Sequence, residues 1–169
     1  MKPNNGLCFG DVKELLSYNP ESGVLTWISQ GSAYGKVRGK VAGTIRKDKS
    51  LNVKIYGANY LAHRIAWLLH FGNLPETEID HIDGDPSNNR ISNLRVASRE
   101  QNAMNRAKQS NNKSGYKGVR FLHKLGKWVA EISANKSHYH LGLYDSAEDA
   151  SDAYTKAAHE LHGDFCNVK

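Results

Sequence analysis

The chain has 169 residues, of which 39% are hydrophobic, and its mean hydropathy is −0.62. That length allows one ordinary domain or two small ones to bury a core without disulfides or metals. No stretch approaches the roughly 18 uncharged apolar residues of a membrane-spanning helix, and residues 1–16 lack the apolar centre of a secretory signal. The composition therefore excludes a membrane protein and predicts a cytoplasmic one. Cys8 and Cys166 lie far apart in the sequence without metal-ligand spacing, and we expect free thiols.

Lysine and arginine outnumber aspartate and glutamate by 23 to 17, which gives a net charge of +6 and favours a polyanionic partner. Residues 36–54 carry seven basic side chains against Asp48 alone, and residues 90–113 carry six against Glu100 alone. Residues 76–85, between them, hold five acids and no base. An acidic centre between basic stretches suits a metal-dependent enzyme acting on nucleic acid, because carboxylates bind the cation and basic residues bind phosphates. An ordinary solvated charge pattern is the alternative.

The N-terminal part of the chain predicts helices around a small sheet. Asp11 and Glu14 form a capping-box pattern ahead of apolar residues, which predicts a helix to about Tyr18. Helical spacing returns at 61–72, where Gly72 is placed to end the helix. Between the two helices, alternating apolar and β-branched residues predict a small antiparallel sheet with strands at 23–28, 40–45 and 51–57.

The central stretch predicts the order strand, loop, strand, helix. Residues 78–83 and 94–97 have the pattern of short strands on either side of a turn rich in Gly, Asp and Asn. Ser98 begins a second capping box, which opens a helix to about residue 108. Residues 109–115 contain no apolar side chain, so we expect a linker and a domain boundary there.

The C-terminal part predicts a meander followed by a helix. Ser146 caps this helix, which Gly163 ends. The three strands of the meander are expected at 116–122, 127–133 and 137–144. The apolar residues of the helix share one face, where small side chains allow close packing on a sheet: Ala147, Ala150, Tyr154, Ala157, Ala158 and Leu161.

Four polar residues of the central stretch can act together in chemistry. Asp80 and His81 end a strand, Asn93 follows twelve positions after His81, and Asn102 lies in the helix beyond. In a hairpin followed by a helix, Asp and Asn oxygens can share a divalent cation while a neutral imidazole takes a proton from water. These groups supply the requirements of phosphodiester hydrolysis. Each residue alone also fits an ordinary turn or a hydrogen-bonded loop.

The combined pattern resembles the HNH endonucleases that phages and mobile introns encode. The resemblance covers about residues 20–108 and is carried by the helix before the motif, by DHIDGDPSNNRISNLR at 80–95 and by EQN in the following helix. It implies a ββα-metal (His-Me finger) module that cleaves DNA in a bacterial or phage-infected cell. It also implies one Mg²⁺ or Mn²⁺ ion per active site and no small-molecule cofactor. On the helix before the motif, we expect His63, Trp67 and His70 to be packing or surface residues.

The resemblance implies a role for each matched position. His81 is the general base, and Asn93 ties the loop and helps to hold that base. Asp80 and Asn102 are the metal ligands, with Asn at a position where many relatives have His. A structural role in the hairpin turn is implied for Asn88, Asn89 and Arg90.

Residues 114–165 resemble the plant Apetala-two/ethylene-response-factor DNA-binding domain, which also occurs fused to HNH nucleases. The match includes YKGV, GKWVAEI, HLGLYDSAEDA and ELHG. It implies a three-stranded antiparallel sheet packed on one helix, whose exposed face binds the major groove of double-stranded DNA. The implied DNA-binding positions are Lys117, Arg120, Lys127, Glu131, Ser133, His138 and His140. Several of these differ from the residues of plant members, so the plant target sequence cannot be transferred.

We therefore predict an α+β protein with an HNH nuclease domain at 1–108, a linker at 109–115 and a DNA-binding domain at 116–169. The predicted activity is metal-dependent cleavage of double-stranded DNA at a preferred site. One active site in a monomer would produce nicks unless two chains assembled on the DNA. Two other interpretations stay open, a DNA-binding regulator whose HNH fold has lost activity and an RNA-binding protein.

Overall fold

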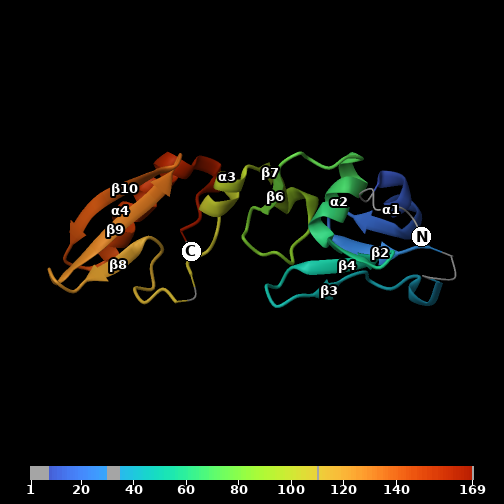
Figure 1. The fold of residues 1–169 in the computed structure, drawn as a ribbon, viewed down its shortest axis with the longest axis horizontal. Coiled ribbons are helices and arrows are strands. Elements are labelled where there is room, and N and C mark those ends of the chain that lie inside the picture. The colour runs from blue at the N-terminus through green and yellow to red at the C-terminus, as the bar shows by residue number, and fades with distance from the viewer. Residues whose placement is uncertain (1–7, 30–34, 110, 169) are drawn as a thin grey trace. The chain divides into compact units, whose positions relative to one another are not determined.

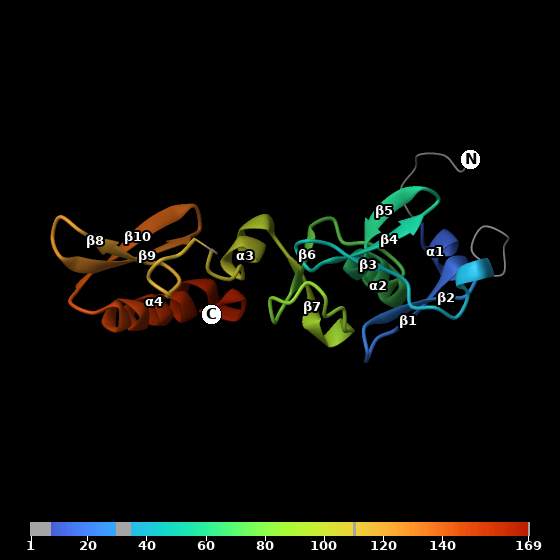
Figure 2. The same ribbon diagram turned by 90° about the horizontal axis from the view of Figure 1, so that it is seen from below.

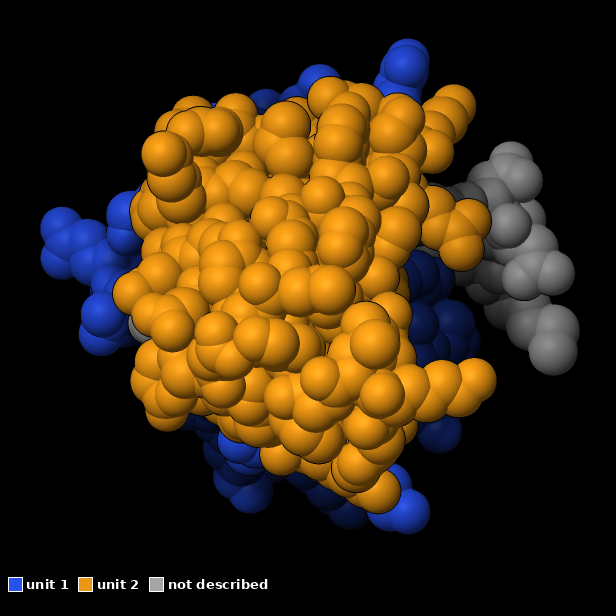
Figure 3. All heavy atoms as spheres, turned by 90° about the vertical axis from the view of Figure 1, so that its left-hand side faces the viewer, with its two compact units in different colours: residues 1–96 blue, residues 97–169 orange. Residues whose placement is uncertain are grey.

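The computed structural model describes residues 8–29, 35–109 and 111–168 (Figure 1). Internal contacts divide the chain into two compact units, residues 1–96 and residues 97–169, which have different colours in Figure 3. This division falls ahead of the segment that the sequence predicts as a linker. Both units combine helices with small sheets, which confirms the predicted α+β class. None of the helices among the described residues is long and apolar enough to cross a membrane.

Among its described residues, the first unit contains three small sheets and two α-helices. Strand β1 pairs antiparallel with β2, strands β3, β4 and β5 form an antiparallel sheet in that order, and β6 pairs with β7. The elements in chain order are α1 (Phe9–Leu15), β1 (Leu16–Asn19), β2 (Val24–Trp27), β3 (Thr44–Ile45), β4 (Leu51–Ile55), β5 (Ala58–Leu61), α2 (Ala62–Phe71), β6 (Glu78–His81) and β7 (Leu94–Ala97).

Helix α1 is shorter than predicted and has a different cap. Its N-cap is Cys8, whose Sγ atom accepts a hydrogen bond from the backbone of Asp11. The helix ends at Leu15 because the next residues pair with β2, which places Leu16 in the core. The predicted continuation of the helix to Tyr18 is therefore wrong. Both cysteines are free, as predicted.

The predicted single sheet forms as two sheets. An isolated bridge between Thr26 and Val41 and a hydrogen bond from the Gly39 N–H to the Trp27 carbonyl link β2 to the segment that leads to β3. The strand predicted at 40–45 is reduced to the short β3, and β5 was not predicted at all. Both sheets contribute to one core with the two helices, whose most deeply buried side chains are Val12, Leu16, Val53, Ile55 and Ile65.

Helix α2 connects this core to the paired strands β6 and β7. The helix forms as predicted, and Gly72 ends it in the left-handed conformation with its N–H bonded to the Leu68 carbonyl. On the side of the strands, Ala66 of α2 packs with Ile79 of β6 and Leu94 of β7. Since successive side chains of a strand point to opposite faces, the residues next to Ile79 and Leu94 face away from this packing.

The second unit is a short helix, a three-stranded antiparallel meander and a long helix. Strand β9 lies between β10 and β8, and α4 packs along one face of the sheet (Figure 2). The predicted capping box at Ser98 and Gln101 is present at the start of α3. The predicted meander and final helix are also confirmed. The elements are α3 (Arg99–Met104), β8 (Val119–Leu122), β9 (Lys127–Ala134), β10 (Ser137–Tyr144) and α4 (Ala147–His162).

The core of the second unit lies between the sheet and α4. Alanines of α4 allow the helix to approach the sheet closely, with Ala150 against Val119 and Ala130. Tyr154 and Ala158 of the same helix pack with Ile132 of β9. The apolar stripe expected on this helix is therefore its buried face.

Candidate active site

His81 lies at the end of β6 with a fixed ring orientation. The ring is buried, and its Nε2 atom is 3.1 Å from the side-chain oxygen of Asn89. The Asn89 amide nitrogen donates to the Ser87 carbonyl, which directs the Asn89 oxygen toward the ring. Nε2 is therefore the nitrogen that carries the proton, and in the neutral ring Nδ1 carries the lone pair.

A second histidine packs against the first. His63 of α2 meets His81 edge to face, with 5.1 Å between ring centroids. Burial, followed by the nearby charges of His81 and Arg64, lowers the pKa of His63 to about 4. His63 is therefore neutral at neutral pH. From the sequence we expected His63 to be a packing or surface residue. In the structure it contacts His81, the predicted base.

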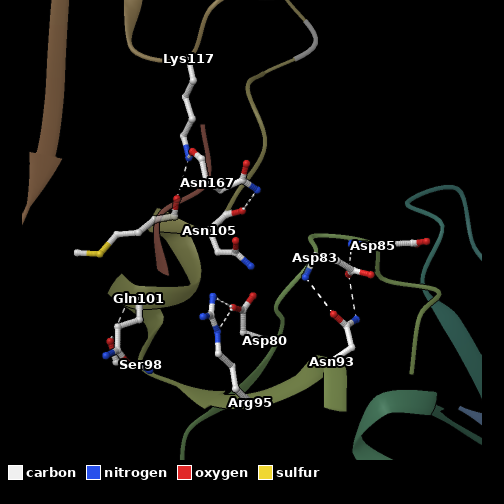
Figure 4. A network of polar contacts seen from close by, with 11 residues as sticks. Asp80, Asp83, Asp85, Asn93, Arg95, Ser98, Gln101, Asn105, Lys117 and Asn167 are labelled. Carbon is white, nitrogen blue, oxygen red and sulfur yellow. Dashed lines mark hydrogen bonds and ion pairs between the residues drawn. The ribbon is translucent and has the colours of Figure 1, made fainter. Parts of the chain in front are cut away.

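Asp80 lies on the opposite face of β6 from His81. Its side chain is almost fully buried, and its Oδ2 atom accepts a hydrogen bond from Arg95 Nε at 2.9 Å and forms an ion pair with Arg95 Nη2 at 2.8 Å (Figure 4). Arg95 is on β7, the strand paired with β6. Two close contacts with one guanidinium hold the carboxylate in one orientation. Sequence reasoning missed Arg95.

Asn93 ties the two ends of the loop between β6 and β7. Its side-chain oxygen accepts a hydrogen bond from the Asp83 backbone at 3.0 Å, and its amide nitrogen donates to the Asp83 carboxylate at 2.9 Å (Figure 4). The same amide nitrogen donates to the Asn88 carbonyl at 2.8 Å. Its own carbonyl accepts from the Ile82 N–H. Three side-chain bonds from one residue therefore hold the loop that carries Asn89.

Asp83 is a further charged residue of this loop that the sequence did not single out. Burial opposes its ionisation, but hydrogen bonds from Asn88, the Asp85 backbone and Asn93 outweigh that effect and lower its pKa. Asp83 is thus an anionic centre for the loop's own donors. The sequence Asp-Gly-Asp at 83–85 and the asparagines that follow indicate a turn. They do not indicate the hydrogen bonds that Asp83 accepts.

The β1–β2 hairpin, which comes earlier in the sequence, also supports this loop. The Tyr18 hydroxyl donates to the Asn89 carbonyl at 2.7 Å, and the Pro20 carbonyl accepts from the Ile91 N–H at 3.0 Å. Burial raises the pKa of Tyr18 to about 12. Gly23 has a φ of +76°, and a Cβ atom there would lie 2.6 Å from the Arg90 nitrogen. The close approach of the hairpin to the loop therefore requires glycine at this position.

Asn102, the second predicted metal ligand, lies on α3 in the second unit and is partly buried. The other three residues of the predicted set lie in the first unit. Across 8–29, 35–109 and 111–168, no group of three or more His, Cys, Asp or Glu side chains is placed to hold a metal ion. A site with Asp80 as its carboxylate would therefore depend on water and substrate oxygens, as magnesium sites commonly do.

In the second unit, most of the predicted DNA-binding residues gather around Glu131. Arg120 of β8 donates to both carboxylate oxygens of Glu131, from Nε at 3.0 Å and from Nη2 at 3.1 Å. These bonds lower the pKa of Glu131. His138 and His140 of β10 lie 3.9 and 3.8 Å from the same carboxylate. Ser133 completes the group through a 3.0 Å contact with His138.

Two predicted DNA-binding lysines have protein partners. Lys127 pairs with Asp145 and stays partly exposed. Lys117 is half-buried, which lowers its pKa, and its Nζ donates to the carbonyls of Met104 at 2.7 Å and Asn167 at 2.9 Å (Figure 4). The side chain of Lys117 therefore links the end of α3 to the end of the chain.

Comparison with known proteins assigns the site to a family. A model of the HNH endonuclease family matches residues 60–104, from β5 to the end of α3. The chain is 31% identical over 108 residues to Protein 3.8 of Escherichia phage T7, across 63% of this chain and 88% of that protein. The chain belongs to the HNH endonuclease family and is therefore a nuclease.

Two further similarities are more limited. The chain is 33% identical over 105 residues to the uncharacterized HNH endonuclease L560 of Acanthamoeba polyphaga mimivirus, across 61% of this chain. It spans 54% of that relative's length. A solved structure, that of DNA binding and cleavage by the HNH homing endonuclease I-HmuI, is 17% identical with a TM-score of 0.45 and covers 92% of this chain and 90% of that one.

Proposed function

We propose that the chain hydrolyses phosphodiester bonds of double-stranded DNA at a preferred site, with His81 as the general base. The observation that carries this proposal is the fixed His81 ring, whose Nε2 is directed to Asn89 so that Nδ1 carries the lone pair. A neutral imidazole in a fixed orientation can take a proton from the attacking water as the P–O bond forms. Asn93 supports this role, because it holds the loop on which Asn89 lies.

The proposed cofactor is one divalent cation, Mg²⁺ or Mn²⁺, with Asp80 and Asn102 as its ligands from the protein. Carboxylate and amide oxygens are the hard donors that these ions prefer, so the donor set fits. When bound, the ion would neutralise the charge that develops on the phosphate. Arg95 fixes the orientation of Asp80 through a hydrogen bond and an ion pair to one carboxylate oxygen.

We further propose that residues 116–169 bind the DNA and that residues 1–108 cut it, with 109–115 between them. The exposed group of Arg120, Glu131, His138 and His140 supports this division, because it lies on strands of one sheet and combines donors and acceptors that can contact bases and phosphates. Acting as a monomer with one active site, the chain would cut one strand at each encounter.

A supercoiled plasmid tests the activity, the metal and the product together. We expect open-circular DNA with Mg²⁺ or Mn²⁺ and no cleavage with EDTA. Asp80→Asn keeps a partner for Arg95 but removes the charge, so it should lose metal-dependent cleavage while DNA binding in EDTA survives. Equal cleavage in EDTA would contradict the metal requirement, and linear product at the earliest times would contradict nicking by a monomer. DNA binding without any cleavage would favour the alternative interpretation, a DNA-binding regulator whose HNH fold has lost activity.

A further inference from the structure

The second unit contains a groove beside the open edge of its sheet. The groove has a volume of about 870 Å³. One wall is formed by α3 and the segment after it, with Met104 and Arg106 among its residues, and the other by β8 and β9, with Phe121 and Trp128. Strand β8 is an edge strand, since β9 is its neighbour on one side only.

Hydrogen bonds fix the wall that α3 contributes. Lys117, which precedes β8 in the sequence, donates to the Met104 carbonyl at 2.7 Å. The Asn167 amide donates to the Asn105 carbonyl at 2.7 Å (Figure 4). Ser114 donates to the Val119 carbonyl at 2.8 Å and so attaches the segment after α3 to β8. The groove is therefore preformed and is not a gap beside a free loop.

Positive charge of the second unit is concentrated at this groove. Residues 97–169 contain eleven Lys and Arg against eight Asp and Glu, whereas the groove is lined by six basic side chains and two glutamates. Arg106, Lys113 and Lys136 are exposed there and form no ion pair with any of the residues that the structure describes. Most of the other acidic residues are on or next to α4, and none of these lines the groove.

Aromatic rings lie at the same groove. Phe121 is 38% exposed, and its ring centroid is 4.9 Å from that of Trp128 and 5.0 Å from that of His123. All three residues belong to the β8–β9 hairpin and line the groove. Neighbouring aromatic rings with an exposed surface are the platform on which unpaired bases stack, and a basic groove beside them binds the backbone.

We propose that this groove binds an unpaired DNA strand, with phosphates on Arg106, Lys113 and Lys136 and bases on the rings of Phe121 and His123. Bases within a duplex have no free face for such stacking, so the occupant is single-stranded. The inference rests on the proposed function, because a nuclease that binds DNA supplies the ligand. It adds a single-strand site that borders the sheet face around Glu131, because Arg120 and Glu131 also line the groove.

The test is binding of a fluorescent fifteen-residue oligothymidine to the full chain in EDTA, followed by anisotropy across a salt series. Lys113→Ala and Lys136→Ala should each weaken binding and lower the slope of log affinity against log salt by about 0.7, the value for one phosphate contact on a single strand. Lys156→Ala, an exposed lysine on α4 away from the groove, should leave affinity and slope unchanged. Phe121→Leu, which keeps an apolar side chain at the hairpin, should weaken binding roughly fivefold or more.

The proposal would be overturned if both groove-lysine variants kept the wild-type slope of log affinity against log salt. It would also be overturned if they lost no more affinity than Lys156→Ala. Tenfold tighter binding of the matching oligouridine would overturn it in favour of an RNA ligand. Because these measurements need neither metal nor cleavage, a chain that fails to cut plasmid can still confirm the groove. A chain that cuts plasmid can equally fail to bind the oligothymidine.

Discussion

Adjacent residues of β6 face different environments because a strand directs successive side chains to opposite sides. His81 is on the side of α2, where His63 meets it, and Asp80 is on the side of Arg95. Asp80 and His81, the proposed metal ligand and the proposed base, are thus adjacent in the sequence, yet each has its own partners. Separate partners allow the two side chains to take different roles in a hydrolysis that needs a base and a cation.

The low pKa of His63 predicts a loss of stability in mild acid. The pKa of the folded state is about 4 against an ordinary value of 6.5, so the unfolded chain binds the proton more readily between these pH values. Stability from this residue is therefore complete above pH 6.5 and is lost as the pH falls toward 4. We expect this residue to make the folded state about 2 kcal/mol less stable at pH 5 than at pH 7.

His63→Phe identifies this contribution, because phenylalanine keeps an aromatic ring against His81 but does not titrate. Urea unfolding of wild type and variant at both pH values measures it. The decrease between pH 7 and pH 5 should be smaller in the variant. An equal decrease in both proteins would show that His63 is not the residue responsible.

For helices and strands, the sequence pattern correctly predicted the features that depend on interactions between residues close in the sequence. The capping box at Ser98, the end of α2 at Gly72 and the stripe of alanines on α4 were predictable because each depends on residues a few positions apart. Strand β1 was not, because Leu15 and Leu16 fit helical spacing and the strand exists only through pairing with β2. Secondary structure that depends on a distant partner leaves little trace in its own sequence.

The contacts of the candidate active site also depend on residues that are distant in the sequence. The sequence motif predicted His81, Asp80 and Asn93, but not the partners that orient them. Asn89 is eight positions from His81 and Arg95 is fifteen from Asp80, and these contacts form only when β6, β7 and their loop are folded. The motif identifies residue types for the chemistry, whereas side-chain orientation depends on the tertiary fold.

The packing of α4 on the sheet makes a sharp prediction at Gly118. Its φ is +69°, and a Cβ atom there would lie 2.2 Å from the ring of Tyr154 on α4. Gly115 also has a positive φ, +82°, but nothing lies within 4 Å of its Cβ position. Gly118→Ala should therefore lower the stability of the second unit by at least about 2 kcal/mol more than Gly115→Ala. Unfolding followed by Trp128 fluorescence measures both, and equal losses would mean that backbone strain, not the clash, sets the cost.

At the scale of the whole molecule, the two units contain different parts of the proposed activity. The base and the carboxylate lie in residues 1–96, whereas the sheet face, the groove and α3 lie in residues 97–169. The bonds of Lys117 and Asn167 to the end of α3 assign this helix to the second unit, although the family match ends at residue 104 within it.

A fragment of residues 97–169 should fold, because it contains α4, the complete meander and the core between them. It should bind DNA without cutting it, since Asp80 and His81 are absent. A gel-shift assay and a plasmid assay on the same preparation test both expectations. A fragment that does not fold cooperatively, or that folds but binds no DNA, would contradict the proposed division.

Single-turnover cleavage by His81→Ala tests the central claim, that His81 is the base of an HNH nuclease, most directly. At saturating protein, with equal DNA affinity verified by anisotropy, we expect cleavage at least about 100-fold slower than wild type, because a general base contributes a factor of this size. His63→Phe serves as a matched control for the loss of a buried imidazole and should cut far faster than His81→Ala. Cleavage by His81→Ala at the wild-type rate would show that His81 is not the general base.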